Sequence, residues 1–213
     1  MDVPRDAGNW TIDIEDSMKD MDPSKEPDRW QRMSIFKVPP YIRSLNIDAY
    51  KPRVVSFGPF HHGKEHLKPM EAHKRRALFH FLKRSNCTLK DCCDKLETVM
   101  LQLMEHYEHL DEEWQDKDRF LELMVVDGCF LLEFLSNNKK NFRDYDYSDP
   151  IFGHHSFKSI LSQNIRRDMF LIENQLPLIV LQRLLAPSAY KDAQVVTLYF
   201  NFNINYSKVK VLT

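Results

Sequence analysis

Residues 123–135 are apolar around most of a helical circumference, and this run constrains the fold more than any other feature. A helix without a polar face cannot lie against water, so other elements must cover it on all sides. Apolar residues also recur every three or four positions from residue 69 to 82 and from 89 to 110. The sequence therefore predicts a mainly α fold, an irregular helical domain around a central helix at about residues 118–135.

The segments before and after these helices are less regular. Residues 35–63 contain prolines and glycines that favour an extended path, which we expect to cross helices rather than join a large sheet. Residues 156–186 are predicted to form a further helix that Pro177 breaks or kinks, because proline lacks a backbone donor and crowds the preceding turn. The expected parts are an acidic leader with a short amphipathic helix at 1–30, a helical domain at 31–186 and a β-prone tail at 187–213.

Glycine is scarce, with 5 in 213 residues, and neither GxGxxG nor GxxxxGK[ST] occurs. Phosphate-cradling turns need glycine, so P-loop and Rossmann folds are excluded and we expect no cofactor. The net charge of −1 excludes a globally basic nucleic-acid binder, and no nucleic-acid partner is predicted. No apolar run approaches the ~18 residues that a transmembrane helix needs. We therefore expect the chain as given to be cytoplasmic or peripheral at a membrane.

The four cysteines are Cys87, Cys92, Cys93 and Cys129, and none of them forms a paired CxxC motif. Without paired CxxC motifs a zinc ribbon is disfavoured. The N-terminus lacks the pattern of a secretory signal, which disfavours a disulfide framework. Nothing around Cys129 indicates the lowered thiol pKa that a nucleophile needs. Cysteine use agrees with a reducing compartment, and we expect Cys92 and Cys93 to be small core residues.

The densest polar cluster lies at residues 56–66, where His61, His62 and His66 stand within six positions beside Glu65. Three imidazoles could bind Zn²⁺ or another metal that prefers nitrogen ligands. These three histidines are therefore the candidate metal ligands. A metal-dependent enzyme that combines them with nearby acids is one hypothesis for the function.

A structural interpretation of the same loop competes with the metal site. Gly58, Pro59 and Gly63 favour a tight turn instead of the helix on which zinc enzymes place their HExxH ligands. In that case the histidines donate hydrogen bonds that pin the turn to the helices. We favour this second interpretation.

The central helix contains an acidic motif made of Asp127, Gly128 and Glu133. The glycine is expected to permit close helix packing, because glycine in a helix otherwise costs about 1 kcal/mol relative to alanine. The two acids are six residues apart and cannot act as one acid–base pair without other groups. We expect them to form buried ion pairs with Arg166 or Arg167.

A second polar motif interrupts the helical pattern near the C-terminal end of the domain. Its side chains are expected to satisfy backbone groups that the proline leaves without partners. The motif consists of Asp168, Glu173, Asn174, Gln175 and Pro177.

Basic residues also gather on the helix that starts near residue 69. Lys74, Arg75 and Arg76, with Lys83 and Arg84, are expected to form a solvated face. An alternative use of that face is contact with an acidic lipid or a partner.

Taken together, these motifs resemble the plant-specific family called domain of unknown function 247. They follow the family's order across about residues 10–186, and the resemblance ends after about Pro187. The matching segments are Trp10-Thr11-Ile12-Asp13-Ile14, Ile35-Phe36-Lys37-Val38-Pro39, Ala49-Tyr50-Lys51-Pro52, Val55-Ser56-Phe57-Gly58-Pro59-Phe60-His61-His62-Gly63, Met70-Glu71-Ala72-His73-Lys74, Asp127-Gly128-Cys129-Phe130-Leu131-Leu132-Glu133 and Asp168-Met169-Phe170-Leu171-Ile172-Glu173-Asn174-Gln175-Leu176-Pro177.

The resemblance implies a protein without an established biochemical activity or catalytic residues. Typical members are roughly twice as long and end in a hydrophobic helix that anchors them to a membrane, so the domain here is expected to be incomplete. Some grass members are implicated in pollen self-incompatibility. We therefore expect a non-enzymatic recognition or signalling protein, acting near a membrane through protein partners that are unknown. A truncated product without independent function is a further alternative.

Overall fold

The computed structural model describes residues 32–140, 144–153 and 159–185, with the single positions Thr11, Ile14 and Met18. Most of the acidic leader and the whole of the 187–213 tail lie outside these residues, so the leader helix and the β-prone tail stay predictions. Within the described ranges the chain is mainly helical, as expected. The β pairing found there is an isolated bridge between Ile35 and Tyr107.

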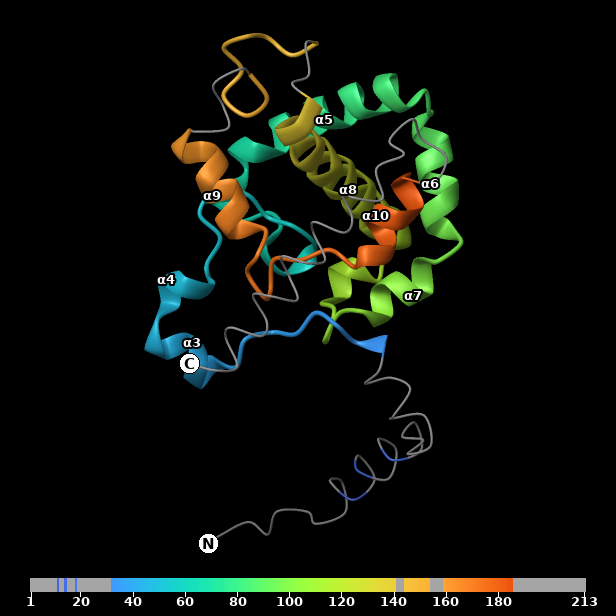
Figure 1. The fold of residues 1–213 in the computed structure, drawn as a ribbon. Coiled ribbons are helices and arrows are strands. Elements are labelled where there is room, and N and C mark those ends of the chain that lie inside the picture. The colour runs from blue at the N-terminus through green and yellow to red at the C-terminus, as the bar shows by residue number, and fades with distance from the viewer. Residues whose placement is uncertain are drawn as a thin grey trace, which may run out of the picture.

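The predicted central helix is α8, Lys117–Lys140. Figure 1 shows it running through the middle of the molecule, with α5 (Pro69–Ser85), α6 (Leu89–Glu97) and α10 (Leu178–Leu185) arranged around it. Residues 123–134 are all buried. This burial confirms what the all-round apolar pattern predicted.

Local chemistry fixes the ends of the surrounding helices. Pro69 opens α5 in its first turn, where the missing N–H is not needed, and Asn86 ends it in the left-handed conformation with φ 53°. Thr88 and Asp91 then form a capping box at the start of α6, each side chain accepting the backbone N–H of the other residue.

The helical pattern over residues 89–110 is divided in the structure. After α6, Val99 leaves the helical conformation with φ −123° and ψ 14°, and the chain continues as α7, Met100–Glu105. Leu96 and Leu103, on the two sides of this break, are both fully buried. The single long helix predicted here is therefore wrong, although its apolar face does reach the core.

The helix predicted over residues 156–186 is also divided, into α9 (Ile160–Asp168) and α10. Side-chain hydrogen bonds stabilise the irregular link between them. Gln175 Nε2 donates to the carbonyl oxygen of Met169 at 2.8 Å and to that of Leu171 at 2.9 Å. An amide side chain that bonds the backbone competes with the helical ladder, so the chain turns before the proline is reached.

The segment at residues 35–63 is less extended than the sequence predicts. It contains two short helices, α3 (Pro40–Leu45) and α4 (Ile47–Tyr50), which lie at one edge of the molecule (Figure 1). Pro40 stands at the start of α3, where proline favours a helical turn. Three short 3₁₀ helices complete the described elements: η1 (Pro59–His61), η2 (Glu65–Leu67) and η3 (Glu112–Trp114).

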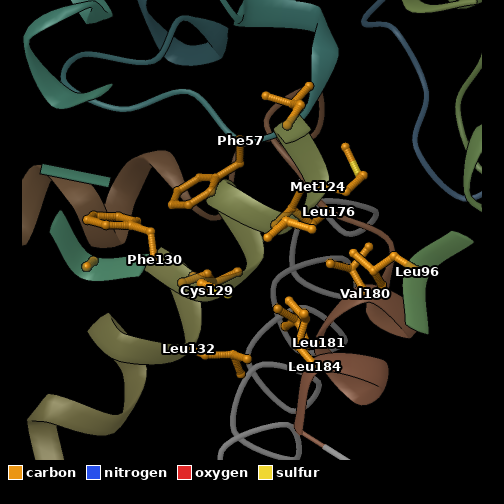
Figure 2. Close-up of a cluster of buried hydrophobic side chains, with 14 of the residues drawn as sticks. Phe57, Leu96, Met124, Cys129, Phe130, Leu132, Leu176, Val180, Leu181 and Leu184 are labelled. Carbon is orange, nitrogen blue, oxygen red and sulfur yellow. The ribbon is translucent and has the colours of Figure 1, made fainter. Parts of the chain in front are cut away.

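Figure 2 shows how side chains from separate elements meet beside α8. Phe130 and Cys129 of α8 lie in the same cluster as Phe57 from the segment after α4, while Val180 and Leu184 come from α10. All five side chains are almost fully buried. The core therefore joins segments that are far apart in the sequence, and burial of their apolar surface is the main contribution to its stability.

Gly128 allows α10 to approach α8 closely. A Cβ at this position would stand 2.6 Å from Leu184 Cδ1 and 2.8 Å from Val180 Cγ1, which is closer than carbon atoms pack. We expect Gly128→Ala to lower the free energy of unfolding by about 1–3 kcal/mol through overpacking, despite alanine's better helix propensity. Urea unfolding measures this change. A Gly128→Ala/Val180→Ala double variant should lose less stability than the sum of the two single variants, because the smaller side chain at position 180 makes room for the added methyl group. A Gly128→Ala variant as stable as the wild type would contradict the prediction.

Candidate functional site

The second polar motif bonds to the backbone of residues 53–58, a segment that pairs with no strand in the part of the chain described. Asp168, at the end of α9, is fully buried. Its Oδ2 accepts the backbone N–H of Arg53 at 2.8 Å, of Val54 at 2.7 Å and of Val55 at 3.2 Å. Buried backbone donors must find acceptors, so one carboxylate takes the place of a neighbouring strand.

Asn174 and Asp127 continue this pattern along the same segment. Asn174 Oδ1 accepts the N–H of Phe57 at 2.7 Å, and Asp127 Oδ2 accepts that of Gly58 at 2.9 Å. We call Asp127, Asp168 and Asn174 the clasp. Asp168 and Asn174 therefore serve residues 53–57, which is a different role from the predicted one near Pro177. Only tertiary contact could bring those backbone groups to them.

The turn after this segment depends on glycine. Gly58 has φ +69°, and a Cβ there would lie 2.7 Å from both the carbonyl oxygen of Gln175 and the hydroxyl oxygen of Tyr107. Gly63 also has a positive φ, of +76°. Both residues have the turn-shaping role that the structural interpretation of the histidine loop predicts.

Lys74 is fully buried, which corrects the expectation that it belongs to a solvated basic face. Its Nζ lies 2.7 Å from Asp127 Oδ1, 2.8 Å from Glu71 Oε1 and 3.2 Å from Ser56 Oγ. Burial raises the pKa of the Asp127 carboxyl, and the Lys74 ammonium acts against that increase. One buried cation therefore joins α5, α8 and the clasped segment.

Glu133 is bonded by Arg84 of α5. The two carboxylate oxygens of Glu133 lie 3.0 and 2.9 Å from Arg84 Nη2, and Arg84 Nη1 also lies 2.5 Å from Asp144 Oδ1. The guanidinium that we expected from Arg166 or Arg167 is thus supplied by Arg84. Instead, Arg167 pairs with the neighbouring Asp168, at 2.8 Å.

The three candidate metal ligands contact different partners. His61 Nε2 lies 3.3 Å from Glu173 Oε2 and its Nδ1 lies 2.5 Å from Lys64 Nζ, while burial lowers the pKa of His61. His66 Nε2 donates to the carbonyl oxygen of Pro52 at 3.1 Å. The ring of His62 meets Trp114 edge-on. Among the residues described, no group of three or more His, Cys, Asp or Glu side chains is placed to hold a metal ion.

Glu173 connects the histidine loop to α3. Its carboxylate accepts the N–H of Val38 at 2.5 Å, pairs with Arg43 of α3 and faces His61. Hydrogen bonds from these groups lower the pKa of the Glu173 carboxyl against the effect of its burial. A buried carboxylate of this kind fixes the position of the backbone and charges around it.

The pKa shifts of the two buried cysteines have opposite directions. Cys129 of α8 and Cys92 of α6 are fully buried, and burial raises the pKa of Cys129 well above its usual range, whereas a hydrogen bond with the Cys129 thiol lowers the pKa of Cys92. A thiol that stays protonated reacts poorly, so the surroundings of Cys129 do not favour a nucleophile. The carboxylates of Asp127 and Asp168 accept backbone N–H groups, so these two acidic residues stabilise the fold.

The comparison with known proteins decides the family. A profile of plant proteins of unknown function, DUF247, matches residues 35–211. The chain belongs to the DUF247 family. It is 37% identical over 155 residues to the UPF0481 protein At3g47200 of Arabidopsis thaliana, and 29% identical over 181 residues to the putative UPF0481 protein At3g02645 of the same plant. No solved structure matches.

The two relatives are much longer than this chain. The alignments cover 70% and 84% of the chain but 30% and 32% of the relatives, so the chain spans about a third of their length. We expected the resemblance to end near Pro187, but the DUF247 match reaches residue 211, which corrects this expectation. The expectation was too short because the last recognisable motif ends at Pro177. No helix among those described is long and apolar enough to cross a membrane.

The sequence indicated that Asp127 and Glu133 are unusual buried acids, but it did not indicate the cations that pair with them. Lys74 and Arg84 stand in an ordinary stretch of charged helix, and their residue types do not show that they lie near the core. Trp114, which is buried in contact with His62, was also missed, although aromatic side chains commonly line binding pockets. The spacing of Glu71 and Lys74 on one helix face is a weak signal for their ion pair.

Proposed function

We propose that this chain is a non-enzymatic recognition module that binds a partner protein through α3 and α4. The main evidence is that three large apolar side chains on these helices are exposed: Tyr41 is 73% exposed, Leu45 84% and Ile47 62%. We call these three residues the platform. Neither helix has a buried residue, so the platform is an apolar surface available to a partner.

Polar bonds from the family motifs hold the platform in place. Arg43 of α3 pairs with the buried Glu173, and Arg167 donates to the carbonyl oxygens of Asp48 at 2.5 Å and Lys51 at 3.0 Å. Helices of six and four residues are not stable alone, so these anchors must supply their order. Polar side chains thus fix α3 and α4 to the body and leave the apolar side chains facing outward.

The charges around the platform indicate the chemistry of the partner. Next to the platform stand two exposed cations, Lys51 and Arg53, and one exposed acid, Asp48, while Lys37 and Arg43 pair with Asp111 and Glu173. A complementary surface combines apolar side chains with acidic ones. We therefore infer that the partner presents an acidic and apolar face. Action near a membrane is a further part of this proposal, since an anchored partner would bring the chain to the bilayer.

A photo-crosslinking experiment in plant cells tests the proposal. A photoreactive amino acid at position 45 should crosslink to a discrete protein, which mass spectrometry identifies. The same group at position 79 is the matched control, because Phe79 is 64% exposed on α5, away from the platform. The identified protein is then purified and titrated against wild type, Leu45→Glu and Phe79→Glu by calorimetry.

We expect Leu45→Glu to weaken this binding at least about tenfold and Phe79→Glu to leave it unchanged. Equal crosslinking from positions 45 and 79, or equal affinities of the two variants, would overturn the proposal. Binding to anionic phospholipid vesicles that Leu45→Glu abolishes, without any protein adduct, would assign the platform to a membrane instead. Stoichiometric zinc or iron that is lost in a His62→Ala/His66→Ala variant would favour the metal-dependent enzyme.

A further inference from the structure

A small polar pocket lies where η3 and the first half of α8 meet α5. Its volume is about 150 Å³, and Trp114, His62, Asp127 and Arg75 are among the residues that line it. About 10–15 Å³ of such space admits one water molecule, so the pocket has room for several waters or for a small organic molecule.

Two residues that line this pocket each have a buried ring nitrogen without a hydrogen-bond partner in the described part of the chain. These nitrogens are Nε1 of Trp114, a residue that is 2% exposed, and Nδ1 of His62. An indole N–H can only donate, and leaving it unpaired in a buried position costs about 1–3 kcal/mol. A ligand with an oxygen acceptor would satisfy this donor.

Charge is distributed by depth in the pocket. At the inner end, the carboxylates of the fully buried Asp127 and the mostly buried Glu71 share a single ammonium, that of Lys74. This end therefore carries an excess of negative charge, which favours an incoming cationic group. Burial raises the pKa of Asp127, the nearby Glu71 carboxylate adds to this increase, and the Lys74 ammonium opposes it.

The outer end is lined by two guanidinium groups. Arg119 lies over the ring of Trp114, 4.9 Å from its centroid, and Arg75 lies on the neighbouring turn of α5. Both pair with exposed acids: Arg119 with Glu113 at 2.7 Å and Arg75 with Glu122 at 3.4 Å. Exposed pairs of this kind contribute about 0–1 kcal/mol, so either guanidinium could turn toward an anionic ligand at little cost.

We propose that this pocket binds a small zwitterion of the free amino acid class. The ligand's ammonium would lie against Asp127 and Glu71, and its carboxylate would accept from Trp114 Nε1–H and the outer guanidinium groups. Glycine, alanine and serine are small enough for the pocket. The site lies on elements other than α3 and α4, so it is independent of the recognition surface proposed above.

Indole resonances provide a direct test of binding at this pocket. The chain has three tryptophans, so a protein labelled with ¹⁵N at the indole nitrogen gives a simple spectrum, and Trp114→Phe identifies the Trp114 peak. Glycine, L-alanine and L-serine are the probes. Acetate, inorganic phosphate and ethylamine each carry one of the two charges and serve as controls.

We expect at least one amino acid to shift the Trp114 peak saturably with a Kd of about 1 mM or tighter, and the single-charge controls to leave it in place. Failure of all three amino acids would overturn the proposal. An equal shift with acetate or phosphate would show an anion site, and one with ethylamine a cation site, and either would also overturn it.

Variants separate a role in binding from a role in folding. Arg119→Gln should weaken amino acid binding several-fold in calorimetry without changing the circular dichroism spectrum, because Arg119 is an exposed side chain at the outer end of the pocket. Lys83→Gln removes one positive charge from an exposed position of α5 and is the matched control. If Arg119→Gln and Lys83→Gln bind the amino acid as tightly as the wild type, the carboxylate is not held as proposed.

Discussion

Asp168→Ala is expected to be the most destabilising single substitution among those considered, lowering the free energy of unfolding by about 4 kcal/mol or more. The substitution removes the acceptor of three backbone N–H groups, those of Arg53, Val54 and Val55. Each would stay in a partly or fully buried position where water replaces the lost acceptor poorly. Thermal and urea unfolding followed by circular dichroism measure the loss.

A second aspartate provides the matched control. Asp116 also accepts two backbone N–H groups, those of Asp118 and Arg119, but it is exposed at the start of α8. Water can replace its side chain, so Asp116→Ala should cost about 1 kcal/mol, as for an ordinary helix cap. Asp168→Asn should fall between the two alanine variants, because the amide keeps an oxygen acceptor. Equal losses for Asp168→Ala and Asp116→Ala would show that the clasp does not organise residues 53–58.

Lys74→Met is expected to cost about 3–5 kcal/mol at neutral pH, because it leaves the carboxylate of Asp127 buried without its cation. Adding Asp127→Asn to this variant should recover part of the loss, since asparagine removes the charge and keeps an oxygen for the N–H of Gly58. Lys83→Met, at an exposed position of the same helix, should change stability by no more than about 0.5 kcal/mol. A double variant as unstable as Lys74→Met alone would contradict this explanation.

The pH dependence of Lys74→Met follows from the same carboxyl group. Burial raises the folded-state pKa of Asp127 above 3.8, its ordinary value, and the Lys74 ammonium is the main group that lowers it. Without that ammonium the folded-state pKa rises further. The folded state then holds its proton to a higher pH than the unfolded state does, so stability falls as pH increases from about 3.8 through the raised pKa. The gap between variant and wild type should therefore be wide at pH 7 and narrow toward pH 4, and a gap independent of pH would contradict the assignment.

Periodicity predicted the elements well where the apolar pattern was complete. The prediction of the central helix was correct, because a helix that is apolar around most of its circumference must be buried on nearly all sides. The predicted helices over 89–110 and 156–186 were each divided, because their breaks depend on Val99 and on the Gln175 side chain rather than on apolar spacing. The short helices α3 and α4 were not predicted, since their order comes from Glu173 and Arg167, far away in the sequence.

The motifs were easier to find than their partners. Asp127, Glu133, Asp168 and Asn174 were unusual as polar residues among apolar ones, so they could be selected from the sequence. Lys74 ends one of the matching segments, but its burial could not be predicted, because a lysine in a charged run normally reaches solvent and its partner Asp127 lies on a different helix. Trp114 and His62 also became a candidate pocket only when η3 was placed beside the histidine loop.

A mainly helical chain with one central helix, the turn glycines at 58 and 63, and the resemblance to a plant family could all be predicted from the order of the residues. These features follow from local chemistry and from hydrophobic periodicity, both of which can be read along the chain. The three-dimensional packing shows which cation pairs with each buried acid and which backbone N–H groups each carboxylate accepts. It also decided which apolar side chains remain at the surface. The reason is physical: an ion pair or a buried hydrogen bond depends on distances of about 3 Å between residues that can be more than 100 positions apart in the chain.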